Sequence, residues 1–473
     1  MKYVSTRGQV DSVEFTDAVL MGLADDGGLI VPERIPDLSG RLDELRELSY
    51  SDLALEIVSA YATDISREDL AALIGKSYGE VFDPAVAPVV RVGDAFILEL
   101  WHGPTMSFKD VALQLLGNLF EHILSSRGGA LNILGATSGD TGSAAICGVR
   151  GRKGINIFIM HPQGRISPIQ QRQMTTVLDA NVHNIAIEGS FDDCQQIMKS
   201  LAGDLDFKRA YSLGAVNSVN WARVLAQMVY YFHAAFRVRE LTGAEKVRVC
   251  VPTGNFGNIL AGWYAMRMGA PIERLILATN SNDILSRFFN TGRYSLGEVC
   301  QTLAPAMDIQ VASNFERYLY YKVGCDPDRL RELMAGFAET GGLEVEVAPG
   351  QAVDDAFEAG AADTDELLEA IRACYQEHGY LLDPHTACGL SVAHSLVPAH
   401  VGSGRGQSDE GSPLVCIATA HPAKFPEAIK QATGSDLAHH PTIDELMGLP
   451  TLCETLPKDQ EAVRRFIIET MSQ

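Results

Sequence analysis

Lys109 lies in the run LELWHGPTMSFKDVALQLLG, where an apolar segment gives way to a helical one. The apolar residues 95–101 predict a buried parallel strand, and the apolar spacing over 108–124 predicts a helix. Lys109 therefore opens a helix at the carboxyl end of a strand, the edge of an α/β sheet where ligands bind. Helix dipoles and partial burial lower the pKa of an amine there, which suits Schiff-base chemistry. A lone lysine is more often a solvated surface charge. Other segments of the sequence are therefore needed to decide whether Lys109 has a chemical role.

A glycine-bracketed loop follows the β-branched run 247–253 and consists of Gly254, Asn255, Phe256 and Gly257. Small residues let backbone N–H groups converge at the start of a helix, so this loop can bind a phosphate without a basic side chain. It lacks the lysine of a nucleoside-triphosphate loop and the spacing of a dinucleotide fingerprint. Taken alone, the loop is equally compatible with a plain strand–turn–helix corner.

A third loop, GATSGDTGS, precedes a helix rich in small residues. The hydroxyls of Thr137, Ser138 and Thr141, together with glycine N–H groups and a helix N-terminus, suit a carboxylate or a phosphate. The charge of Asp140 opposes that interpretation, because it would repel an anion. The alternative is that Asp140 and its hydroxyl neighbours only cap the helix.

These loops belong to a chain that alternates strand and helix from residue 95 onward. Buried strands are predicted at 131–137, 155–160, 182–188, 247–253, 274–280 and 414–419. The alternation predicts an α/β fold of parallel sheets wound with helices. Residues 1–95 combine turn signals with helical periodicity and predict a mixed cap, and the acidic region 330–371 predicts a solvated helical face or a surface insertion.

Composition narrows the function classes. A formal net charge of −22 over 473 residues argues against nucleic acid and anionic membranes as partners, and this length predicts two or three domains. Nine cysteines without paired spacing, and the lack of a signal core or membrane-spanning apolar stretch, predict reduced thiols in a cytoplasmic protein. The twelve histidines form no recognisable metal motif, so no metal site is expected.

Five segments, in this order and with these intervals, resemble threonine synthase, a pyridoxal-phosphate enzyme of the tryptophan-synthase β-type fold: HGPTMSFKD, LGATSGDTGSAAI, NSVNWARVLAQ, VPTGNFGN and IATAHPAKFPEAI. The match covers nearly the whole chain and is similar to the longer microbial and fungal branch. It implies a monomer with two wound parallel-sheet domains and the cofactor in the cleft between them. The implied division is a cap at 1–95, a large cofactor-binding domain at 96–128 and 225–473, and a small substrate-closing domain at 129–224.

The resemblance also implies roles for individual residues. Lys109 would form the Schiff base with pyridoxal 5'-phosphate, and the loop from Gly254 to Gly257 would hold the cofactor phosphate. Thr419 matches the position of a hydroxyl set against the pyridine nitrogen, although a threonine at a strand end often only satisfies the backbone. Asp140 would have to face the cofactor ring hydroxyl or be protonated.

The implied substrate is O-phospho-L-homoserine, converted with water to L-threonine and inorganic phosphate by β,γ-elimination and β-addition, the last step of threonine biosynthesis. Thr137, Ser138 and Thr141 match the loop that holds the substrate carboxylate. The residues that match the family's binding site for the departing phosphate are Asn217, Ser218 and Arg223, with Arg165 as the next candidate cation. Two alternatives stay open: a phospholyase that releases a keto acid, and a catalytically silent protein on the same fold.

Overall fold

The computed structural model describes residues 1–79, 81–137, 139–214, 216–347, 352–396 and 411–472, so Ser138 lies outside the described residues. Its larger sheet has the strand order β13-β10-β9-β14-β4-β3. The parallel members are β4 (Ala95–Glu99), β9 (Val247–Pro252), β10 (Ile272–Thr279), β13 (Phe357–Ala361) and β14 (Leu414–Ala418). The edge strand β3 (Val89–Val92) runs antiparallel to β4.

The smaller sheet is entirely parallel, with the order β15-β7-β6-β5-β8. Its strands are β5 (Leu131–Ala136), β6 (Ile155–Pro162), β7 (Val182–Glu188), β8 (Leu213–Gly214) and β15 (Glu454–Pro457). The helices that follow its first strands are α6 (Asp140–Val149), α7 (Pro168–Thr175), α8 (Phe191–Gly203) and α9 (Leu205–Ala210). The predicted α/β fold with two wound parallel sheets is confirmed.

Two long helices occupy the centre of the molecule, α5 (Lys109–Arg127) and α10 (Trp221–Thr242). Every residue from Asp110 to Phe120 is buried, because α5 packs against α6, α10 and α4 (Arg67–Tyr78). A helix that is largely apolar around its circumference is stable only when it is enclosed in this way. The central position of α5 fixes the direction in which its first residue, Lys109, can face.

The N-terminal region forms the expected mixed cap. It contains β1 (Tyr3–Ser5), α1 (Phe15–Met21), β2 (Ile30–Pro32), η1 (Ser39–Arg41), α2 (Leu42–Leu45), α3 (Tyr50–Ser59) and α4. The rings of Tyr3 and Tyr61 pack on Trp221 at the start of α10, with centroid distances of 6.0 and 5.6 Å. The cap is therefore continuous with the core around α10.

The remaining elements complete the larger sheet and its surroundings. They are α11 (Gly257–Arg267), α12 (Ile284–Thr291), β11 (Arg293–Ser295), η2 (Pro305–Met307), α13 (Phe315–Lys322), α14 (Pro327–Thr340), β12 (Gly342–Glu344), α15 (Thr364–His378), α16 (Pro384–Leu396), η3 (Pro422–Lys424), α17 (Pro426–Thr433), α18 (Pro441–Gly448) and α19 (Gln460–Met471).

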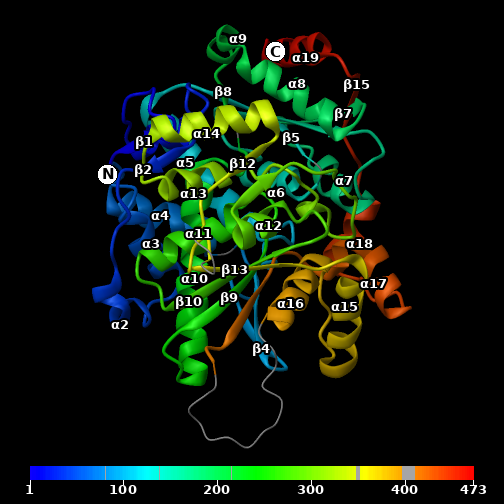
Figure 1. Ribbon diagram of the computed structural model, residues 1–473. Helices are drawn as coiled ribbons and strands as arrows, with labels where there is room; N and C mark the ends of the chain where they lie inside the picture. Colours follow the sequence, from blue (N-terminus) through cyan, green and yellow to red (C-terminus); the bar gives the residue numbers. More distant parts are fainter. Residues whose placement is uncertain (80, 138, 215, 348–351, 397–410, 473) are drawn as a thin grey trace, which may run out of the picture.

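The sheets differ from the expected division at both ends of the chain. β3 lies within 1–95 but joins the larger sheet, because a turn at Gly93 folds it back on β4. β15 lies within 225–473 but pairs with β7 of the smaller sheet, and α19 packs on α8. Figure 1 shows this C-terminal segment, in red, beside α8 and β7 and away from α17. The acidic region 330–371 is also more than a surface insertion, since it supplies β13 to the larger sheet.

Three further findings concern membrane-spanning helices, metal sites and cysteine thiols. No helix that the structure describes is long and apolar enough to cross a membrane. In the described ranges, no group of three histidine, cysteine or acidic side chains is placed to hold a metal ion. All nine cysteines are free thiols, five of them buried.

Candidate active site

Three neighbouring strands of the larger sheet end beside one another, since β14 lies between β4 and β9. Lys109 follows β4, Thr419 follows β14, and the loop from Gly254 to Gly257 follows β9. The backbone N–H of Phe108 donates to the Thr419 carbonyl at 2.8 Å, which fixes the start of α5 against the end of β14. The sheet thus brings the predicted lysine, hydroxyl and glycine loop to one edge.

The Lys109 amine faces the smaller sheet. Its Nζ lies 3.4 Å from Asp140 Oδ2, and only 12% of the side chain is exposed. Burial lowers the pKa of this amine, Asp140 opposes the shift, and the positive charges of Lys424 and Arg223 reinforce it. A buried amine with a lowered pKa has the properties that Schiff-base chemistry requires.

Asp140 opens α6 at the carboxyl end of β5, so its contact with Lys109 joins the edges of the two sheets. Its Oδ1 lies 2.7 Å from Lys424 Nζ and accepts a hydrogen bond from Gln170 Nε2 at 2.8 Å. Burial alone would raise the pKa of the carboxyl, but Lys424 and Lys109 hold it well below its usual range. The structure therefore favours an ionised Asp140 over a protonated one.

Lys424 and Gln170 were not expected in the site. Lys424 lies in the segment IATAHPAKFPEAI. Its buried amine is paired with Asp140 and donates a hydrogen bond to the Thr105 carbonyl at 2.8 Å. The segment itself was the only signal that could have pointed to Lys424. Gln170 lies in α7, the helix that follows β6 of the smaller sheet, and no sequence motif pointed to it.

The glycine loop has the geometry of an anion cup. Phe256 adopts a left-handed conformation with φ 63°, and no side chain in the described ranges caps α11, so the first N–H groups of that helix lack a side-chain acceptor there. A Cβ on Gly254 would stand 2.3 Å from the Ala306 carbonyl oxygen. The Asn255 carbonyl accepts from Asn314 through both N and Nδ2 at 3.1 Å, which holds the loop in place.

In the loop before α6, the Thr137 hydroxyl is already engaged. It accepts from the N–H groups of Gly139 and Gly142, each at 3.0 Å, and donates to the Gly139 carbonyl at 3.1 Å. Thr137 is buried and shapes the loop, whereas Thr141 is partly exposed. The N–H groups of Gly139 and Gly142 are thus already engaged, and the geometry leaves the Thr141 hydroxyl as an accessible donor.

Asn217, Ser218 and Arg223 lie between β8 and the first turn of α10. Arg223 is 3% exposed, its Nη1 donates to the Val216 carbonyl at 3.0 Å, and its Nε has no partner among the residues that the structure describes. Burial lowers the pKa of the guanidinium to about 10, so the group stays charged at neutral pH. Within the described ranges no carboxylate forms an ion pair with Arg223, and a buried cation without a counter-ion is costly.

Ser218 has a different set of neighbours. Its Oγ lies 3.3 Å from Ser313 Oγ, and Ser313 Oγ donates to Asn255 Oδ1 at 3.1 Å. Ser218 is therefore connected to the glycine loop, while Arg223 is electrostatically coupled to Lys109. Asn217 is partly exposed, and its carbonyl accepts from Asn220 N at 3.1 Å in the turn before α10.

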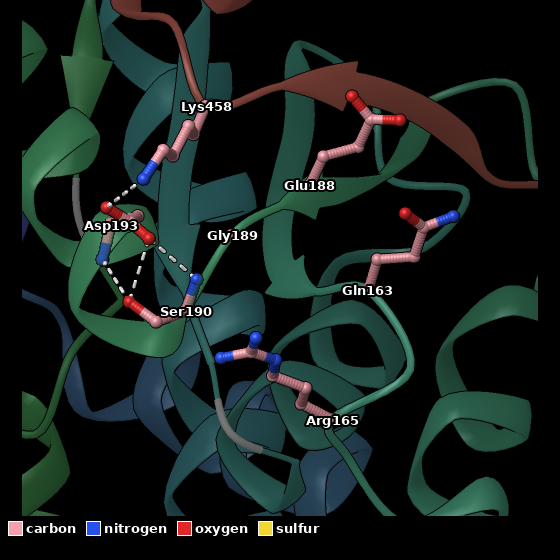
Figure 2. Close-up of a pocket in the computed structure, with 7 residues that line it drawn as sticks. All are labelled: Gln163, Arg165, Glu188, Gly189, Ser190, Asp193 and Lys458. Atoms are coloured by element: carbon pink, nitrogen blue, oxygen red, sulfur yellow. Dashed lines mark hydrogen bonds and ion pairs between the residues drawn. The ribbon is translucent and has the colours of Figure 1, made fainter.

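Arg165 lies apart from these residues, in a cavity of about 450 Å³ at the carboxyl ends of β6, β7 and β15. Figure 2 shows Arg165 and Lys458 entering this cavity from opposite sides. Ser190 and Asp193 form a capping box at the start of α8, so the helix N-terminus here is already satisfied. The cavity contains none of the residues around Lys109, and we do not assign the chemistry to it.

The residues around Lys109 fit pyridoxal phosphate. The uncapped start of α11 offers backbone N–H groups to a phosphate, and the buried amine of Lys109 suits an aldehyde. The hydroxyl-bearing Thr419 directly follows β14, the strand between β4 and β9. Fold and site together define a pyridoxal-phosphate-dependent α/β enzyme. A family model described as "Pyridoxal-phosphate dependent enzyme" matches residues 88–362.

Two further family models flank that match, "Threonine synthase N terminus" over residues 2–78 and "Threonine synthase, C-terminal" over 386–467. The threonine synthase of Pseudomonas aeruginosa is 44% identical over 99% of this chain and 98% of its own length. The pyridoxal-phosphate-bound threonine synthase of Brucella melitensis superposes with a TM-score of 0.92 at 43% identity, and the yeast threonine synthase with 0.91 at 38%; both alignments cover at least 99% of each chain. The chain belongs to the threonine synthase family.

Proposed function

We propose that this enzyme converts O-phospho-L-homoserine and water to L-threonine and inorganic phosphate. The observation that carries the substrate assignment is Arg223, a buried guanidinium whose Nε has no partner in the described part of the chain and whose charge acts on Lys109. Such a cation requires an anion close to the reacting lysine, and a phosphate ester on the substrate supplies one.

Bound pyridoxal phosphate supplies an electron sink for proton removal next to the substrate amino group. The Lys109 amine then moves protons at Cα and Cβ of the substrate, since it opens α5 at the junction of both sheets. Thr419 would offer a neutral hydroxyl to the pyridine nitrogen. Asp140 would meet the ring hydroxyl as an ionised carboxylate, which fits the low pKa that Lys424 and Lys109 impose against burial.

Two phosphate groups have to be held apart in this reaction. We assign the cofactor phosphate to the loop from Gly254 to Gly257, whose N–H groups need no counter-charge. We assign the substrate phosphate to Arg223, because a planar guanidinium meets a dianion with two hydrogen bonds. We assign the substrate carboxylate to the loop before α6, where the Thr141 hydroxyl is the accessible donor.

Water must reach Cβ only after phosphate has left, because early entry would hydrolyse intermediates of the reaction to keto acids. The Lys109 to Asp140 contact joins the two sheets, so closure of the smaller sheet over the larger one brings the carboxylate ligands onto the substrate and excludes water.

Product analysis tests this proposal against its nearest rival. Purified enzyme incubated with O-phospho-L-homoserine is expected to release phosphate and L-threonine in equal amounts. A phospholyase on the same scaffold would release phosphate with 2-oxobutyrate and no threonine. A protein that binds the cofactor but releases no phosphate would support the catalytically silent alternative.

We further propose that the enzyme acts as a monomer in the cytoplasm. Nine free thiols suit a reducing compartment, and a formal charge of −22 opposes self-association of like surfaces. Sedimentation is expected to give a single species of 51.2 kDa at all concentrations, and a concentration-independent dimer would overturn the monomer.

A further inference from the structure

Lys424 is a second lysine at the site, and its side chain is completely buried. It lies in η3, directly after the turn that follows Thr419. Its Nζ contacts Asp140 Oδ1 at 2.7 Å and donates to the Thr105 carbonyl at 2.8 Å. Lysine is almost never fully buried unless its charge is paired, so the contact with Asp140 is what permits this position.

The two oxygens of Asp140 are used unequally. Oδ1 takes the short contacts, from Lys424 at 2.7 Å and from Gln170 at 2.8 Å, whereas Oδ2 faces Lys109 at 3.4 Å. At these distances the first counter-ion of the carboxylate is Lys424. Asp140 does not depend on Lys109 for its neutralisation.

We propose that Lys424 is a positioning residue of the active site, the counter-ion that keeps Asp140 ionised and thereby leaves the Lys109 amine free to react with the aldehyde of pyridoxal phosphate. The inference deepens the proposed function and rests on it for the role of Lys109. Lys424 touches Asp140 and Thr105 in this arrangement, and it acts on the cofactor through Asp140.

The charges around Lys109 give the direction of the effect. Asp140 faces it from α6, Lys424 from η3 and Arg223 from α10. Beyond the lowering by burial, Asp140 raises the pKa of the Lys109 amine, and Lys424 and Arg223 lower it. Without the charge of Lys424, Asp140 would pair with Lys109 alone, so the amine would stay protonated to a higher pH.

The test follows covalent attachment of pyridoxal phosphate to the cofactor-free protein. The aldehyde condenses with the Lys109 amine and releases water, and borohydride traps the product for mass spectrometry. The rate is measured against pH, because only the neutral amine reacts. We expect Lys424→Met to move the midpoint of this profile upward by about one pH unit, equivalent to a tenfold loss of neutral amine below the midpoint.

Two companion variants isolate the charge. Lys424→Arg keeps a cation and should keep a midpoint close to the parent's. The double variant Asp140→Asn with Lys424→Met removes both charges, so its midpoint should fall at least about one unit below that of Lys424→Met. Lys424→Gln, which keeps a donor without charge, replaces Lys424→Met if the latter does not fold.

Gln170→Met is the matched control, because Gln170 donates to the same Asp140 oxygen but is neutral. Its midpoint should stay close to the parent's. The proposal fails if the folded Lys424→Met or Lys424→Gln protein retains the parent's midpoint, or if Gln170→Met shifts it as far. No phosphohomoserine enters this assay, so a failure of the substrate assignment would leave its result unchanged.

Discussion

Two candidate phosphate sites of this enzyme are built from different groups. The loop from Gly254 to Gly257 offers backbone N–H groups at the uncapped start of α11 and contains no cation. The start of α10 offers Arg223, a buried guanidinium for which the described part of the chain provides no carboxylate. One site therefore uses helix dipoles, and the other uses a full charge.

In the proposed reaction, this difference matches the length of time for which each phosphate would stay bound. Partial charges on a loop need no counter-ion when the site is empty, which suits a phosphate that is bound throughout turnover. An unpaired buried cation is unfavourable until an anion arrives, so it favours the closed, substrate-bound enzyme over the empty one. The same chain can thus hold one phosphate permanently and release another in each cycle.

The largest expected effect comes from the lysine placed between the two sites. Lys109→Ala should retain the fold, because the side chain ends in the site, but lose covalent cofactor attachment and several orders of magnitude in turnover. Circular dichroism checks the fold, and absorbance with a phosphate-release assay checks the function. Normal turnover in this variant would remove Lys109 from the mechanism and, with it, the reason to place either phosphate here.

Arg223→Ala should separate the two sites. We expect kcat/KM for phosphohomoserine to fall by about 2 to 4 kcal/mol in free-energy terms, while the affinity for pyridoxal phosphate stays unchanged. Steady-state kinetics and a cofactor titration of the same preparation measure both quantities. If the variant loses cofactor binding, or if its turnover is unchanged, the substrate phosphate must be assigned to another cation, and Arg165 is the next candidate.

A thermal-shift experiment provides the control for Arg223. Inorganic phosphate should stabilise the parent protein by binding the folded state, and this increment should be reduced in Arg223→Ala. Without phosphate, Arg223→Ala loses the hydrogen bond to the Val216 carbonyl but also removes a buried charge. Its free energy of unfolding should therefore fall by no more than the contribution of that hydrogen bond.

The sequence predicted these sites unequally well, for a physical reason. β4 and β14 are largely apolar runs, and the carboxyl ends of β4 and β9 locate Lys109 and the glycine loop from local pattern, whereas Thr419 after β14 was indicated by the family resemblance. The burial of Lys424 has no local pattern, because it depends on Asp140, which reaches it from the other sheet. Local sequence specifies where an element ends, and tertiary packing decides which charges meet there.

The same distinction explains two strands that the sequence did not predict, β13 and β15. β15 is a short, largely exposed strand, and it forms because β7 presents an edge to which it can pair. β13, with the sequence FEAGA, lacks the β-branched residues that usually mark a strand and is defined by its pairing with β10. Neither partner lies near its strand in sequence.

A smaller effect is expected at the glycine loop itself. Gly254→Ala places a Cβ 2.3 Å from the Ala306 carbonyl oxygen, so the loop or η2 must shift and the N–H groups lose their alignment. We expect the dissociation constant of pyridoxal phosphate to rise about tenfold. Gly257→Ala is the control, since its Cβ would meet only the Asn314 side chain at 3.2 Å, and equal losses in both variants would contradict this account.

The smallest expected effect decides to which phosphate site Ser218 belongs. The family resemblance groups Ser218 with Arg223, but its hydroxyl contacts Ser313, which donates to Asn255 in the glycine loop. Removing one neutral hydrogen-bonding hydroxyl costs about 0.5 to 1.5 kcal/mol. If the contacts are decisive, Ser218→Ala weakens pyridoxal phosphate binding by that amount and leaves the KM for phosphohomoserine unchanged, as measured on cofactor-saturated enzyme. A raised KM with unchanged cofactor affinity would return Ser218 to the substrate phosphate, and the boundary between the two sites would then pass between Ser218 and Ser313.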